Sequence, residues 1–213
     1  MEKFPLTDKN QITRLPKRGE YDKEVVYKIL DEALVCTLAY VRDGQPFQIP
    51  TGFCRMGNKV YLHGSVGSFY MRELAEKKLP VCISVTHIDG LVLARSAFHH
   101  SVNYRSVVLF SHAEKVEDQN ELYEALEVFT NKMQQGRWED VRKPTAGEWK
   151  ATMVIAFNIE EASAKIRVGG PKDDDEDYAL DIWAGVVPLK IQRLPVIPDD
   201  VLKDGIPVPE YLK

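Results

Sequence analysis

The stretch L-V-L-A-R-S-A-F-H-H-S-V-N-Y-R-S-V-V-L-F, residues 91–110, places a polar loop between two apolar runs. The runs at 91–94 and 107–110 consist of side chains typical of buried strands, so they predict a strand–loop–strand unit. The loop between them, 95–106, carries two arginines, two adjacent histidines, three serines, an asparagine and a tyrosine. Because anions need several donors held on a rigid scaffold, this loop is a candidate anion-binding site.

Strand patterns continue on both sides of this unit. Further strands are expected at 35–41, 47–54, 60–63, 81–86, 153–159 and 164–168, and the run at 107–110 extends to 116. Turns at Asp43-Gly44 and Gly57-Asn58 join the first three into an antiparallel meander. Helical periodicity is limited to 22–33, a helix beginning near Ser68, and 119–134. Short strands joined mostly by tight turns favour a mainly β fold, a closed or nearly closed barrel with flanking helices.

Length and composition indicate one domain. The 213 residues, 44% of them hydrophobic, suffice for a single core, which we assign to 1–189, followed by an extended proline-rich tail at 190–213. The formal charge of −4 disfavours nucleic acid and anionic membranes as partners, since both attract a basic surface. An acidic run at 172–177 lacks the glycine and terminal glutamate of an EF-hand and is expected to be a solvated loop.

The cysteines and the N-terminus predict a cytoplasmic protein. Cys36, Cys54 and Cys82 lie in predicted strands, are odd in number and form no C-x-x-C motif, a pattern typical of free thiols in a reducing compartment. The first residues lack the apolar core of a signal peptide, and no apolar run reaches membrane-spanning length.

A second polar motif, Y-L-H-G-S-V-G-S-F-Y-M-R-E-L, spans residues 61–74. It reads as a strand, a Gly/Ser turn and the start of a helix, and the free N–H groups of a helix start attract phosphate. Arg72, one helical turn beyond Ser68, can reach the same anion. The alternative is structural, because Ser68 is equally a helix cap and Gly64 and Gly67 are equally turn residues.

Together the two motifs resemble the pyridoxamine-phosphate-oxidase-like split-barrel superfamily, in particular its flavin-nucleotide-binding and nitroimidazole-resistance-like branch. The resemblance extends from about Thr13 to Leu189 and is most specific in the H-G-S-x-G-S-x-x-M-R-E-L and R-S-A-F-H-H-S-V-N-Y-R-S segments. It implies a six-stranded antiparallel split barrel that forms a homodimer and binds FMN in two clefts at the dimer interface.

The resemblance also implies roles for individual residues. The phosphate would be held by hydroxyl and basic side chains, which correspond here to Ser65, Ser68 and Arg72 in one group and Tyr104, Arg105 and Ser106 in the other. The isoalloxazine ring would lie along strand backbone at Pro50-Thr51-Gly52 and Leu62-His63-Gly64. Arg95 and Ser96 are further candidate contacts, and Trp183 would come from the partner subunit or cover the ring.

Several features leave alternatives open. His99 and His100 can contact the ligand, ligate haem or serve the structure, and no histidine pair has the spacing of a zinc site. Trp138 and Trp149 flank the loop at 144–147, where they either cap a ligand cleft or pack in a core or interface.

The expected function is an FMN-dependent oxidoreductase acting on a small substrate, such as a nitroaromatic or quinone-like compound. The alternative is a flavin carrier or sensor without turnover, or a haem-binding relative. True pyridoxamine-phosphate oxidase activity is disfavoured, because the segment at 191–195, I-Q-R-L-P, lacks the tryptophan of the usual ending.

Overall fold

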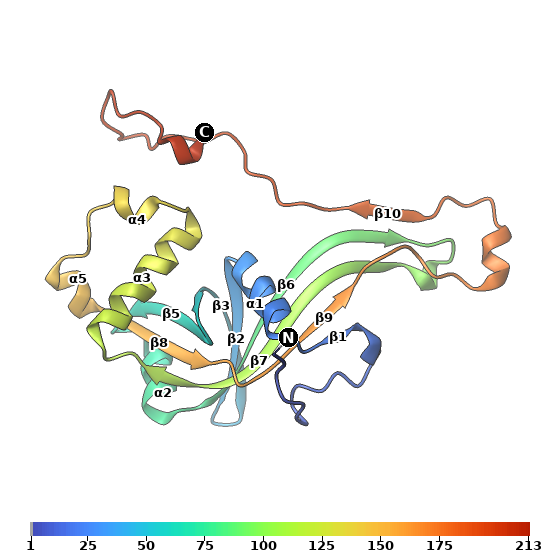
Figure 1. Ribbon diagram of the computed structural model, residues 1–213, viewed down its shortest axis with the longest axis horizontal. Coiled ribbons are helices and arrows are strands. Elements are labelled where there is room, and N and C mark those ends of the chain that lie inside the picture. Colours follow the sequence, from blue (N-terminus) through green and yellow to red (C-terminus); the bar gives the residue numbers. More distant parts are fainter. Residues whose placement is uncertain (1) are drawn as a thin grey trace.

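The computed structural model describes residues 2–213, which form one antiparallel sheet with helices around it (Figure 1). Its strands are β1 (Gly19–Glu20), β2 (Val35–Arg42), β3 (Gln45–Gly52), β4 (Cys54–Met56), β5 (Lys59–Ser65), β6 (Pro80–Leu93), β7 (Ser101–Lys115), β8 (Thr152–Asn158), β9 (Glu161–Arg167) and β10 (Gly185–Pro188). Its α-helices are α1 (Lys23–Glu32), α2 (Phe69–Lys77), α3 (Gln119–Met133), α4 (Arg137–Asp140) and α5 (Ala146–Ala151). The predicted mainly β class is confirmed.

The long strand β7 joins the two halves of the barrel. The main strand order is β3-β2-β6-β7-β8-β5-β4, and β9 pairs with β7 along the edge opposite to β6. The first part of β7 pairs with β6 and β9, whereas its last residues, 113–115, pair with β8. The sheet has ten strands rather than the expected six, partly because β1, β4 and β10, each of four residues or fewer, extend its edges. The largest fully buried side chains, which include Phe53, Leu62 and Phe157, fill the interior of the barrel.

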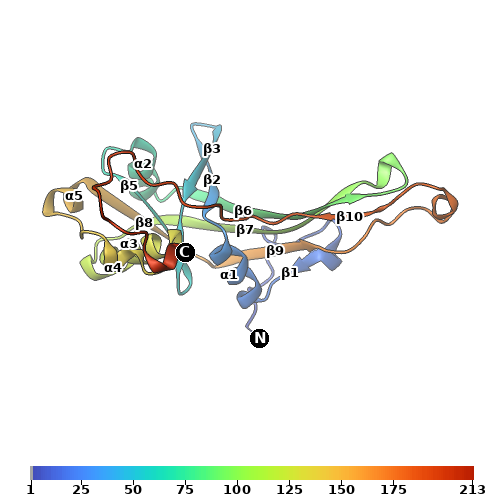
Figure 2. The same cartoon turned by 90° about the horizontal axis from the view of Figure 1, so that it is seen from above.

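The predicted strand–loop–strand unit is the β6–β7 hairpin, whose outer end extends away from the barrel (Figures 1 and 2). The sequence predicted two strands, at 81–86 and 91–94, but β6 is continuous from Pro80 to Leu93. A register shift between Ile88 and Gly90 forms a β-bulge between these two predicted segments, so the strand bends there without ending. Gly90 lies under β10, and a Cβ there would come within 3.1 Å of both Val186 and Val187.

The predicted helices form where expected, and the structure contains two further α-helices that the sequence analysis did not predict. Asp22 caps α1 by accepting hydrogen bonds from the backbone of Glu24 and Val25, and α1 buries its apolar face in the core. Both missed helices, α4 and α5, are short. The start of α5 has a capping box between Thr145 and Glu148, so the T-x-x-E pattern was the signal that could have identified it.

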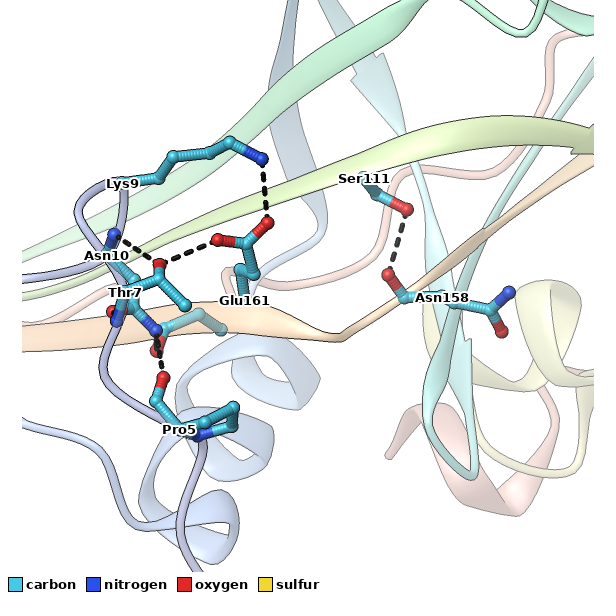
Figure 3. Close-up of polar contacts among 8 residues, drawn as sticks. Pro5, Thr7, Lys9, Asn10, Ser111, Asn158 and Glu161 are labelled. Carbon is cyan, nitrogen blue, oxygen red and sulfur yellow. Dashed lines mark hydrogen bonds and ion pairs between the residues drawn. The ribbon is translucent and has the colours of Figure 1, made fainter.

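Polar contacts attach the N-terminal segment to the sheet (Figure 3). Thr7 donates a 2.6 Å hydrogen bond to Glu161 at the start of β9, and Lys9 forms an ion pair with the same carboxylate at 2.7 Å. Nearby, the Ser111 hydroxyl donates to the backbone oxygen of Asn158 at 2.8 Å. These contacts hold together the region where β7, β8 and β9 meet.

The chain beyond β10 is extended and returns along the molecule towards α3 and α4 (Figure 1). Arg193 donates a hydrogen bond to Gln134 at the end of α3, and near the end of the chain Tyr211 accepts hydrogen bonds from Gln134 and Arg137. No helix within residues 2–213 combines the length and apolarity needed to cross a bilayer.

Candidate functional site

The turn between β5 and α2 forms a cradle of unengaged donors. Its backbone is closed by hydrogen bonds from Ser68 N to the Ser65 carbonyl at 2.8 Å and from Gly67 N to the Ser65 hydroxyl at 3.1 Å. Ser68 occupies the N-cap position of α2, yet its side chain makes no capping hydrogen bond. Arg72 is exposed, and its guanidinium has no hydrogen bond or ion pair within residues 2–213. A hydroxyl, a guanidinium and the amides of a helix start therefore remain available here, a donor set that suits a phosphate.

Gly64 fixes the approach of α2 to β5. A Cβ at this position would lie 2.5 Å from the sulfur of the buried Met71, closer than packed atoms can come. The glycine therefore brings the start of α2, and with it the cradle, directly against the strand.

His63 lies under α3 rather than in open space. Its ring meets Phe129 edge-on, with 4.2 Å between centroids, and its Nδ1 atom is buried with no partner in the described chain. Burial lowers the pKa of His63, so the ring is neutral at pH 7. Phe129 also covers Gly52, where a Cβ would lie 3.0 Å from its ring. Pro50 and Thr51, the other predicted ring contacts, lie on β3 opposite Thr37 and Cys36.

At the tip of the β6–β7 hairpin, the acidic loop engages the predicted donors. Asp173 accepts hydrogen bonds from the backbone N–H groups of Arg95 and Ser96 and from the Arg95 guanidinium at 3.1 Å. His99 faces Asp174, with 3.2 Å from Nε2 to the carboxylate. This part of the acidic run is thus a structural partner of the hairpin, and the prediction that the run is simply solvated was wrong for Asp173, whose side chain is buried.

His100 differs from His99 in its hydrogen bonding. Its Nδ1 atom lies 3.0 Å from the backbone carbonyl of Ser96 and must donate to it, because a carbonyl can only accept. Nε2 is therefore the ring nitrogen that stays free of this hydrogen bond, and the ring is exposed. Trp183, 68% exposed, belongs to the same end of the molecule, since Gly185 of β10 pairs with Leu93.

Arg105 is already paired with two carboxylates. Its Nε and Nη2 atoms each lie 2.9 Å from Asp89, and its Nη1 donates to Glu32 at the end of α1. The neighbouring Ser106 hydroxyl donates to the Lys165 carbonyl at 3.3 Å, and Tyr104 pairs across the sheet with Ile88 and Arg167. The Arg105 charge is therefore balanced inside the chain.

Within one chain the two predicted groups of phosphate ligands, one at residues 65–72 and the other at 104–106, do not meet. The cradle lies beside β8, where Ser65 pairs with Thr152. The end of β7 also pairs with β8, at Lys115, whereas Arg105 lies ten residues before Lys115 along β7. That run of strand spans roughly 33 Å. Both views show the hairpin tip and the β5–α2 cradle at opposite ends of the molecule (Figures 1 and 2).

A cleft of about 1010 Å³ opens next to the cradle. It lies between the start of α2, the end of β7 and the helices α3 and α5, and among its lining residues are Val66, Arg72, Lys115, Tyr123, Trp149 and Lys150. The rings of Tyr123 and Trp149 are stacked, with 5.9 Å between centroids, whereas Trp138 is buried behind Tyr123. Of the two tryptophans that flank the 144–147 loop, Trp149 faces the cleft and Trp138 packs in the interior.

Comparison with known proteins identifies the family of this fold. The family model described as pyridoxamine 5'-phosphate oxidase matches residues 22–166, more than half of the chain, so the protein belongs to that family. No curated protein matches the sequence.

Among solved structures, the flavocytochrome Anf3 from Azotobacter vinelandii is 39% identical, with a TM-score of 0.90 over 97% of this chain and 95% of that one. An FAD and haem binding protein from Mycobacterium smegmatis is 38% identical, with a TM-score of 0.87 over 91% and 95% of the two chains. A candidate 5-nitroimidazole antibiotic resistance protein from Bacteroides thetaiotaomicron, 19% identical with a TM-score of 0.58 over 70% and 86%, shares the fold.

Proposed function

We propose that this protein binds a flavin and acts as a flavin-dependent oxidoreductase on a small substrate. The observation that carries the proposal is the β5–α2 cradle, where Ser68 and Arg72 are unengaged at the start of a helix packed against a strand. A bound flavin supplies the electron transfer, and the protein binds and orients it. Two relatives above 35% identity, a flavocytochrome and an FAD and haem binding protein, support this proposal.

Two flavins are candidates for this site. The resemblance of the sequence to the split-barrel superfamily implies FMN, whereas the similarity to the FAD and haem binding protein from M. smegmatis favours FAD. Both nucleotides contain the same riboflavin 5'-phosphate, for which the cradle is suited. The relative covers 91% of this chain at 38% identity, so we favour FAD. A nitroaromatic or quinone-like substrate follows from the family resemblance alone.

We also propose a homodimer in which the partner's hairpin completes each flavin site. The chain exposes 13869 Å², whereas a compact monomer of 24.3 kDa exposes about 10,000 Å². Much of this surface is apolar, including Phe98 at the hairpin tip and Ile191 and Ile197 in the tail, each about nine-tenths exposed. Obligate dimers bury roughly 2,000–5,000 Å² or more over both partners together, so an excess of about 3,900 Å² in each chain leaves ample surface for such an interface. A two-fold dimer also offers a way for the cradle of one chain to meet hairpin residues of the other chain across an interface, with Arg105 excluded because it is already paired.

The second candidate function is that of a flavocytochrome, with haem held by His100. The hydrogen bond from Nδ1 of His100 to the Ser96 carbonyl orients the ring so that Nε2 is the nitrogen available to a metal, the arrangement that metal-bound histidines adopt. His99, by contrast, is turned to Asp174. The exposed apolar side chains of Phe98 and Trp183, at the same end of the molecule, offer surface for a porphyrin.

Three measurements on the purified protein test these proposals. The absorption spectrum of the protein should contain flavin bands, and a Soret band if haem binds, while chromatography of the released nucleotide distinguishes FMN from FAD. Light scattering should give twice 24.3 kDa. A colourless protein that binds neither added FMN nor added FAD would refute the flavin proposal.

The location that we propose is cytoplasmic, because the three cysteines are free thiols in the described chain.

A further inference from the structure

We propose that the cleft between α2, α3 and α5 binds the adenosine diphosphate half of FAD. This inference rests on the proposed flavin site and extends it, since FMN would leave the cleft empty. It predicts which residues distinguish the dinucleotide from the mononucleotide.

The cleft and the cradle are continuous. Val66 and Arg72 line the cleft and also belong to the turn and the helix start that form the cradle. The backbone N–H of Val66 donates to the Ala151 carbonyl at 2.9 Å, which ties the cradle to the end of α5. A ligand whose phosphate lies in the cradle therefore has the cleft as its nearest enclosed space.

The cations of the cleft suit a second phosphate. Arg72, Lys115 and Lys150 line it, against one carboxylate, Glu117. Within residues 2–213, no ion pair engages Arg72 or Lys150, and Lys115 approaches only Glu117, at 3.6 Å between two well-exposed side chains. This surplus of positive charge is local, since the whole chain has a formal charge of −4. A pyrophosphate satisfies such a cluster.

The aromatic wall suits a purine. Trp149 and Tyr123 line the cleft with stacked rings, and the buried Trp138 meets Tyr123 edge-on and fixes its position. A base stacks on such a platform whatever its hydrogen-bonding edge. At about 1010 Å³, the cleft has the size of sites that accept drug-sized ligands.

The test is a comparison of FAD and FMN on the full-length protein and its variants. Each is titrated with FAD, FMN and ADP, and binding is followed by flavin fluorescence or, for ADP, by calorimetry. Trp149→Ala should raise the Kd for FAD and for ADP about ten-fold, since a stacked base is worth that much on a protein surface. The Kd for FMN should stay within about two-fold of wild type, because FMN does not reach the platform.

Three further variants make the comparison specific. Trp149→Phe retains a stacking ring and should restore most of the FAD affinity. Lys150→Ala should weaken FAD more than FMN, whereas Lys28→Ala, an exposed lysine on α1 away from the cleft, should affect neither. Circular dichroism and the melting temperature verify that each variant is folded.

The outcomes separate this proposal from the one on which it rests. Wild-type protein that binds FAD and FMN equally, or a Trp149→Ala variant whose FAD and FMN affinities change together or not at all, would overturn the adenosine cleft and leave the flavin site standing. Wild-type protein that binds neither nucleotide would overturn both.

Discussion

Replacing Arg105 by alanine should destabilise the protein without abolishing flavin binding. The sequence suggested Arg105 as a phosphate ligand, but its guanidinium contacts Asp89 through two hydrogen bonds of 2.9 Å and also contacts Glu32. It therefore joins the end of α1 to β6 and β7. Arg105→Ala removes all three contacts and leaves two carboxylates close together.

The magnitude follows from the partial exposure of the three side chains, which are 28% to 40% accessible. Hydrogen bonds to buried charged groups contribute about 1.5–3 kcal/mol each, whereas an exposed ion pair contributes about 0.2–1 kcal/mol. For bidentate pairing at intermediate exposure we expect a loss of about 1–2 kcal/mol. In a chain of this length, that corresponds to a fall in melting temperature of about 3–6 °C.

The assay is urea unfolding of the wild type, Arg105→Ala, Asp89→Asn and the double variant. The two single changes should be coupled by about 0.5–1.5 kcal/mol, because they remove the same contact. Flavin titration of folded Arg105→Ala should give an affinity within about two-fold of wild type. If stability were unchanged while flavin binding was lost, Arg105 would be a cofactor ligand and our assignment would be wrong.

The pH dependence provides an independent check. Hydrogen bonds from Arg105 hold the pKa of Asp89 below its ordinary value of 3.8. A carboxylate with a lowered pKa in the folded state stabilises the protein above its unfolded pKa, and this contribution disappears as the pH falls through the folded value. The stability difference between wild type and Arg105→Ala should therefore be constant above about pH 5 and shrink in stronger acid.

Three further predictions concern the scaffold. Gly64→Ala should lower the melting temperature and weaken flavin binding together, because its Cβ would lie 2.5 Å from the Met71 sulfur; a variant as stable as wild type would contradict this close packing. Cys36 and Cys54 should resist thiol reagents at pH 8 in the folded protein, because burial raises the pKa of each to about 12, and should react once urea unfolds it; rapid labelling of the native state would disprove their burial. Asp22→Ala should cost about 1 kcal/mol in urea unfolding by removing the cap of α1, and Asp22→Asn, which can still cap, should cost less; equal losses would show that capping is not the cause.

Local patterns predicted most of the secondary structure. The 35–41 strand, the 119–134 helix and the Asp43-Gly44 turn all lie within two residues of their observed positions, and both turn residues have the positive φ angles that a tight hairpin requires. The α5 helix was missed because a Pro-Thr-Ala-Gly segment reads as a loop unless its capping box is noticed. The continuity of β6 was missed because a bulge and a turn use the same residues.

The donors of the candidate site were visible in the sequence, whereas their availability was not. Composition alone identified 61–74 and 95–106 as the two polar motifs. It could not show that Arg72 has no partner in the described chain while Arg105 is paired with Asp89 and Glu32. Glu32 is more than 70 residues away in sequence, and no local pattern encodes such a contact.

The sequence by itself thus determined a mainly β chain of the pyridoxamine 5'-phosphate oxidase family and the residue types of its anion site. Only the tertiary structure decided that the cradle stands beside a cleft with Trp149 on its wall, and that the hairpin loop lies at the other end of the molecule. The physical reason is that helix and strand periodicity depends on neighbours along the chain, whereas the charge state and accessibility of a side chain depend on which distant segments fold against it.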